Sequence, residues 1–153
     1  MTTITRREIL IGGTAALLAA PAILRAQQLF TEFPFRLGIA SGDPSHDGFV
    51  IWTRLCADPL DEHGGIPTAP IEVNWAVYSD EAMQRIVQQG VATAVPELAH
   101  SVHVELSGLE PDRPYWYRFA VGRERTQLGR TRTLPLPGKA LDRLRFGVAG
   151  CQN

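Results

Sequence analysis

Hydrophobic and polar residues alternate along several short stretches between residues 33 and 133, with the period of two that marks a half-buried β-strand. Within residues 71–77, Ile71, Val73, Trp75 and Val77 fall on one side of the chain. Residues 48–55 are apolar on both sides, which is typical of a strand at the centre of a sheet. The pattern predicts seven strands, at residues 35–40, 48–55, 71–77, 91–95, 100–106, 115–121 and 129–133.

One segment between these strands is expected to form a short helix. Ser79 or Asp80 is a suitable N-cap, and Gly90 is a suitable stop. Between them, one helical face would carry Met83, Ile86 and Val87. Seven short strands with one brief helix favour an antiparallel β-sandwich over a parallel α/β fold.

A tyrosine motif sharpens this prediction. Leu109 and Pro111 are followed, four residues after the proline, by Tyr115 and then Tyr117. The spacing resembles the corner of fibronectin type III domains, where a tyrosine hydroxyl bonds to the backbone and pins a turn between two sheets. A chance turn before an aromatic strand is the alternative. We therefore expect an all-β fold over residues 33–134, a fibronectin III/immunoglobulin-like antiparallel β-sandwich.

The first 26 residues are expected to be an export signal. Arg6 and Arg7 precede an apolar run, residues 9–20, that is too short and too rich in Gly and Ala for a transmembrane helix of about 20 residues. The paired arginines match the twin-arginine pattern, with an ordinary secretory signal as the alternative. We expect cleavage after Ala22 or Ala26, export to the periplasm or the extracellular space by the twin-arginine machinery, and no stable membrane anchor.

The composition after residue 134 changes. Residues 135–143 are expected to be a linker, and residues 144–151 a new strand that ends in Gly150 and Cys151. The sequence stops two residues later, so we expect residues 144–153 to be the start of a larger, truncated domain.

Composition and charge exclude several function classes. The chain is 44% hydrophobic and 20% charged with a net charge of −1, and it has no basic stripe, so nucleic acid is not an expected partner. It carries no Gly-rich phosphate loop, Ser nucleophile motif or paired carboxylates. His100 and His103 should face opposite sides of one strand, and solvated loops or turns are expected for His46, His63 and Asp43.

Five segments, in order, resemble the successive landmarks of PhoD-type alkaline phosphatases/phosphodiesterases: residues 35–44, 49–55, 109–117, 129–133 and 145–152. The resemblance implies a fibronectin-like N-terminal domain ahead of a metallophosphoesterase domain. It also implies hydrolysis of phosphate mono- and diesters at alkaline pH by one Fe(III) ion and two Ca2+ ions, through a metal-bound hydroxide.

One metal ligand of the family falls inside this sequence. Cys151 matches the iron ligand that ends the family's first catalytic strand, with Gly150 in place of the family's Ser. The remaining ligands would lie beyond Asn153, in the catalytic domain that is the chain's missing partner. The resemblance therefore implies that these 153 residues alone are inactive and hold no metal.

Alternatives remain for the cysteine and for the function. Cys151 could form a disulfide with Cys56 or remain an unliganded thiol, and Cys56 itself is expected to be a small buried residue. A secreted, non-catalytic fibronectin-like binding module is the main alternative function. A different calcineurin-like phosphatase with a fibronectin-like front domain is a third, which Cys151 argues against.

Overall fold

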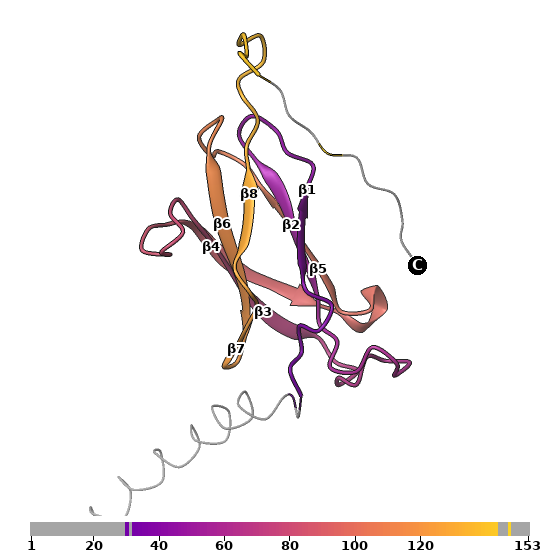
Figure 1. Cartoon of the computed structure of the whole chain (residues 1–153). Coiled ribbons are helices and arrows are strands. Elements are labelled where there is room, and N and C mark those ends of the chain that lie inside the picture. Colours follow the sequence, from indigo (N-terminus) through magenta and orange to yellow (C-terminus); the bar gives the residue numbers. More distant parts are fainter. Residues whose placement is uncertain (1–29, 31, 144–146, 148–153) are drawn as a thin grey trace, which may run out of the picture.

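The computed structural model describes Phe30, residues 32–143 and Gly147, and it shows two antiparallel sheets packed face to face (Figure 1). In the smaller sheet β2 lies between its two neighbours, in the order β1 (Ile39–Gly42), β2 (Phe49–Arg54) and β5 (Ser101–Leu106). The larger sheet has the order β4 (Ile86–Ala94), β3 (Ile71–Tyr78), β6 (Pro114–Val121) and β7 (Glu124–Arg125), and β8 (Gly129–Arg132) also pairs with β6. A 3₁₀ turn at Pro96–Leu98 connects β4 to β5.

The core lies between the sheets, and burial alternates along the strands that face it. In β2 every second residue is buried, and β6 shows the same pattern over its whole length. The aromatic rings of Phe49 in β2 and Tyr115 in β6 join the two sheets, with ring centroids 5.9 Å apart. Burial of large apolar side chains stabilises the fold by about 1.5–3 kcal/mol each, and the fully buried ones include Phe119, Ile51, Leu55, Val73, Val77 and Val121.

The all-β sandwich and the tyrosine corner are both confirmed. The Tyr115 hydroxyl accepts a hydrogen bond from the backbone N–H of Glu110 at 2.9 Å and donates to the Glu110 carbonyl oxygen at 3.4 Å. Tyr115 is 2% exposed, so these bonds are shielded from solvent. They fix the turn between β5 and β6, where the chain crosses from the smaller sheet to the larger one.

The prediction of a short helix between Ser79 and Gly90 is wrong. Residues 79–85 form a closed turn, in which the Asp80 carboxylate accepts hydrogen bonds from the backbone N–H groups of Gln84 (3.0 Å) and Arg85 (2.8 Å). Met83 has φ 56°, a left-handed conformation that no α-helix contains. From Ile86 the chain is extended as β4, which pairs with β3 from Ile86 to Ala94.

Other strand boundaries differ more modestly. The first strand begins at Ile39, because Gly38 has φ +75° and turns back to bond with the Phe35 carbonyl. The fourth strand, at the edge of the larger sheet, starts at Ile86 instead of residue 91. The two-residue strand β7 was not predicted. Among the aromatic residues of these strands, Phe49 is buried, and Trp52 and Trp75 are partly buried.

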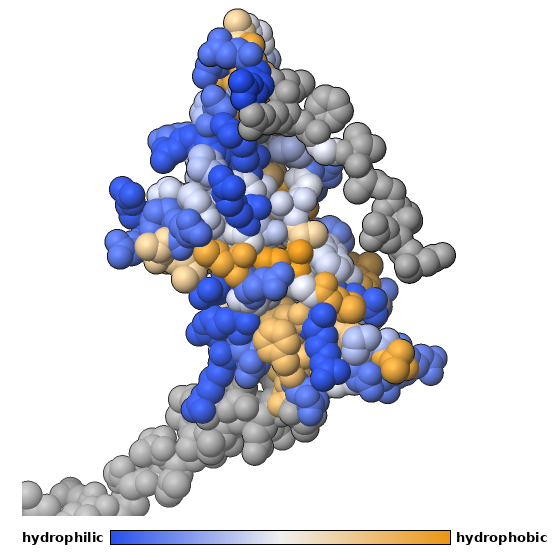
Figure 2. All heavy atoms as spheres, in the orientation of Figure 1, coloured by the Kyte–Doolittle hydropathy of each residue, from blue (hydrophilic) through white to orange (hydrophobic). Residues whose placement is uncertain are grey.

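The segment after β8 is tied to the sandwich. The Asp112 carboxylate pairs with Arg132 at 2.5 Å and with Lys139 at 3.2 Å. The Asp112 N–H donates to the Leu134 carbonyl, and the Leu134 N–H donates to the Ser45 carbonyl. In Figure 1 this segment leaves at the opposite end of the domain from the one where residues 32–36 enter. On the face in Figure 2, a band of hydrophobic residues crosses the middle of the domain, and hydrophilic residues predominate above it.

Candidate functional site

The predicted metal ligand lies outside the described residues. The structure does not describe Cys151. It also does not describe Arg6, Arg7 and most of the predicted strand 144–151. Over residues 32–143, with Phe30 and Gly147, no group of three or more His, Cys, Asp or Glu side chains is placed to hold a metal ion. Among the same residues, Cys56 is a free thiol and only 2% exposed.

The histidines are spread over different parts of the domain. His100 is 4% exposed, and its Nε2 lies 3.1 Å from the Ala69 carbonyl oxygen, so it is a buried structural side chain. His103 is exposed on β5, with its ring centroid 6.4 Å from that of Trp52. His63 reaches the same small hollow as His100, of about 90 Å³. His46 and Asp43 occupy exposed turn positions, as expected.

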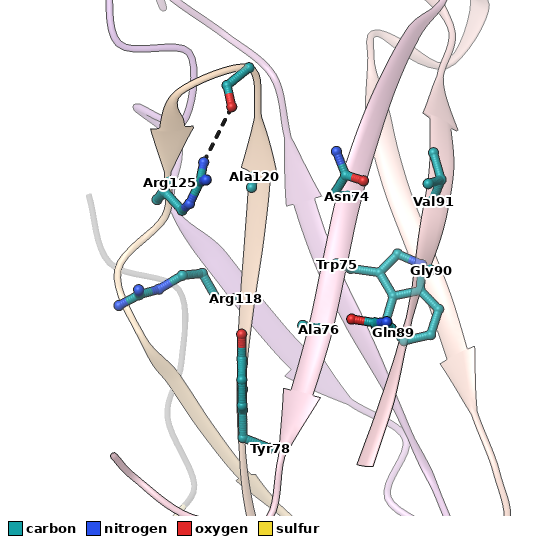
Figure 3. A pocket seen from close by; sticks show the side chains of 11 residues that line it. Asn74, Trp75, Ala76, Tyr78, Gln89, Gly90, Val91, Arg118, Ala120 and Arg125 are labelled. Atoms are coloured by element: carbon teal, nitrogen blue, oxygen red, sulfur yellow. Dashed lines mark hydrogen bonds between the residues drawn. The ribbon is translucent and has the colours of Figure 1, made fainter. Parts of the chain in front are cut away.

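A larger groove, of about 480 Å³, lies on the outer face of the larger sheet (Figure 3). Alternation along the strands turns the side chains of Asn74 and Ala76 in β3, and of Arg118 and Ala120 in β6, away from the core. These residues are direct neighbours across the two strands, with Asn74 opposite Ala120 and Ala76 opposite Arg118. The two alanines have short side chains, which leaves the middle of the face hollow.

The groove is lined by basic side chains and by neutral side chains that can form hydrogen bonds. Eleven residues line it; Arg118 and Arg125 are among them, and none is acidic. Asn74, Gln89 and Tyr78 add neutral polar groups. Arg125 Nη1 donates to the carbonyl oxygens of Gly122 and Glu124, each at 3.3 Å. Beside the groove, the Arg130 guanidinium lies 6.0 Å from the centroid of the Trp116 ring.

Arg118 is exceptional within the described part of the chain. Its Nε is the one buried side-chain nitrogen or oxygen that has no hydrogen-bond partner there. Neither Arg118 nor Arg125 forms an ion pair with a described carboxylate.

This groove was not predicted from the sequence. Its signal was present in residues 115–121, where the outward positions of a core strand carry a tryptophan, an arginine and an alanine. Such a face is ordinary for a solvated sheet, so the pattern alone does not reveal which strands lie beside it.

Comparison with known proteins identifies the family. The family model of the PhoD-like phosphatase N-terminal domain matches residues 19–135. The chain belongs to this family. It is 46% identical over 142 residues to alkaline phosphatase D of Bacillus subtilis (strain 168), an alignment that covers 93% of the chain and 24% of the relative.

Solved structures agree with this assignment. A structure of PhoD matches with a TM-score of 0.71 and 51% identity, over 73% of the chain and 21% of that structure. A fibronectin type III domain of the human KIAA0970 protein matches with a TM-score of 0.50 and 10% identity, over 98% of the chain and 99% of that domain, which supports the fold alone. The chain therefore spans about a quarter of the length of its curated PhoD relative.

The segments that carried the sequence resemblance form part of this fold. The landmark segments at residues 35–44, 49–55, 109–117 and 129–133 lie in or beside β1, β2, β6 and β8 and help to build the sandwich. No helix among the described residues is long and apolar enough to cross a membrane.

Proposed function

We propose that this chain is the N-terminal part of an exported, metal-dependent phosphatase that hydrolyses phosphate mono- and diesters. The observation that carries the proposal is the 46% identity to alkaline phosphatase D over 93% of the chain. An identity of this size along nearly the whole chain supports descent from a common enzyme, and not merely a shared β-sandwich. In this proposal the sandwich is a front domain, over residues 33–134, and the chemistry resides in a domain that begins near residue 144.

The metal part of the proposal rests on Cys151. A thiolate at the tip of a strand is a strong iron ligand, and Cys151 holds the corresponding position in the sequence resemblance. The described residues contain no metal-binding cluster of their own, so Fe(III) and Ca2+ would be held by residues outside the sandwich. When bound, such ions would supply electrostatic stabilisation of the ester oxygens and a hydroxide nucleophile.

The contribution of the described residues would be structural. The sandwich presents the segment after β8 from a fixed position, because Asp112 holds both Arg132 and Lys139. A buried Cys56 would remain a packing residue and would not compete for the metal, since it is only 2% exposed.

The test uses the full-length protein that contains this chain. Hydrolysis of nitrophenyl phosphate and bis(nitrophenyl) phosphate is measured at alkaline pH, together with the iron and calcium content. We expect both esters to be cleaved, and we expect Cys151→Ala to lose iron and activity together. Cys56→Ala is the matched control and should keep its iron. An inactive full-length protein, or full iron content in Cys151→Ala, would contradict the proposal.

A further inference from the structure

The groove on the outer face of the larger sheet has no part in the function proposed above. We propose that this groove binds a phosphate group, either as the free anion or as part of a phosphate ester. The proposal is independent of catalysis, because it concerns binding by residues of β3, β4, β6, β7 and the β6–β7 turn.

Charge is the first reason. Arg118 and Arg125 line the same groove, and no acidic residue lines it. Neither arginine forms an ion pair with any carboxylate in the described ranges. Two guanidinium groups without a neutralising carboxylate create a positive potential in the hollow, and this potential attracts anions.

The unpaired nitrogen of Arg118 is the second reason. Buried polar groups in folded proteins nearly always have a hydrogen-bond partner, and Arg118 Nε has none among the described residues. An oxyanion can accept two parallel hydrogen bonds from Nε and one Nη of a guanidinium. A ligand that draws the Arg118 side chain toward the groove would therefore give the Nε hydrogen its missing acceptor.

The surrounding donors favour phosphate over carboxylate. Asn74, Gln89 and Tyr78 bring two side-chain amides and a hydroxyl to the groove, in addition to the two guanidinium groups (Figure 3). A carboxylate has two oxygens, whereas a phosphate offers more acceptor oxygens in a tetrahedral arrangement and a second negative charge. The short side chains of Ala76 and Ala120 at the bottom leave room for a group of that size.

Nuclear magnetic resonance titration of the chain tests the proposal. Inorganic phosphate, glycerol phosphate and acetate are added separately, and the side-chain Nε–H signal of Arg118 is followed with the backbone signals of β6. We expect both phosphate compounds to shift these signals at concentrations where acetate does not. Tighter binding of glycerol phosphate would identify an ester as the preferred ligand, and tighter binding of inorganic phosphate the free anion; both results support the proposal.

Charge-matched variants separate a built site from general attraction. Arg118→Gln and Arg125→Gln should each raise the phosphate dissociation constant about tenfold or more, since each removes charge-assisted hydrogen bonds. Arg118→Lys should weaken binding too, because it keeps the charge and loses the planar fork. Arg123→Gln removes the same charge from the β6–β7 turn, outside the groove lining, and should bind as the parent does.

Three results would overturn the proposal: no shift of the Arg118 signal with either phosphate compound, equal binding of acetate, or equal weakening by Arg123→Gln and Arg125→Gln. The exposed Arg125 keeps the test decisive if Arg118→Gln fails to fold.

Discussion

The indole ring of Trp75 lies against the backbone of Gly90, its direct partner across β3 and β4. A Cβ atom on Gly90 would come within 2.7 Å of Trp75 Cζ2 and 2.9 Å of Cε2. The absence of a side chain at Gly90 therefore leaves the space that the Trp75 ring occupies against the edge strand β4. The ring packs against the core, and Trp75 and Gly90 are also among the residues that line the groove, so this contact lies directly beside it.

Gly90→Ala should destabilise the domain. The added methyl group must displace the indole ring or separate β4 from β3, at a cost of about 1–3 kcal/mol in the free energy of unfolding. Gly42→Ala is the control, because a Cβ there meets nothing within 4 Å, and its effect should stay within about 0.5 kcal/mol. Urea unfolding followed by tryptophan fluorescence measures both. If Trp75→Phe does not recover part of the loss in the double variant, the proposed contact is not its cause.

Tyr115→Phe should also destabilise the domain while leaving its core packed. The substitution removes the hydroxyl that bonds both the N–H and the carbonyl of Glu110, and it leaves a partly buried N–H without its partner. We expect a loss of about 1–3 kcal/mol. Tyr78→Phe is the control. The Tyr78 hydroxyl, on the outer face of the larger sheet, has no hydrogen-bond partner among the described residues, so its removal should be nearly neutral. Thermal unfolding of the two variants makes the comparison, and equal melting temperatures would refute a role for the corner.

Acid should unfold the domain partly through Asp112. The hydrogen bonds from Lys139 and Arg132 hold the pKa of this carboxyl below its ordinary value of 3.8. A folded-state pKa below the unfolded one means that the ion pairs stabilise the fold above about pH 4 and are lost as the pH falls through the lowered pKa. Hydrogen bonds from the backbone also lower the pKa of Asp61 and Asp80, so they add to the same loss.

Asp112→Asn should therefore lower stability at neutral pH and make the decline in acid shallower. Asp43→Asn is the control, since Asp43 lies at an exposed turn and has no ion pair with a described residue. The free energy of unfolding is measured by urea titration between neutral pH and pH values below 3.8. Parallel pH curves for Asp112→Asn and the parent chain would show that these ion pairs do not matter.

Export should depend on the paired arginines. Replacing Arg6 and Arg7 together by lysine keeps the positive charge of the N-terminal segment and removes the twin-arginine pattern. We expect the protein to accumulate inside the cell, as measured by fractionation and immunoblotting. The matched control replaces Arg25 by lysine, which lies behind the apolar run and should leave export unchanged. Normal export of the double variant would favour an ordinary secretory signal.

The sequence predicted the sandwich well where burial and strand period agree. In β3 and β6 the residues that alternate are also those that pack in the core, so the pattern in the sequence and the structure have the same cause. The tyrosine corner was predictable for a similar reason, because its hydrogen bonds are local and span only from Glu110 to Tyr115.

The failed helix shows the limit of this reasoning. Met83, Ile86 and Val87 have helical spacing, but Ile86 and Val87 are β-branched, and both are more than 40% exposed on an edge strand. The Asp80 side chain does accept N–H groups, as an N-cap would, yet it uses them to close a turn. Pairing with β3 decided the outcome, and that pairing involves residues that are not adjacent in sequence.

The candidate groove could not be predicted because it depends on how strands are ordered in the sheet. Arg118 and Asn74 are far apart in the chain, and only the β3–β6 pairing brings their outward faces together. The proposed metal ligand was suggested by resemblance alone, and it stays a prediction, because Cys151 lies outside the described residues.

The three-way contact of Asp112 with Arg132 and Lys139 has a mechanical consequence. Lys139 is thereby held against the sandwich, so the chain that follows it departs from a restrained point on the domain. Weakening the Asp112 contacts would widen the range of angles over which anything attached there can pivot.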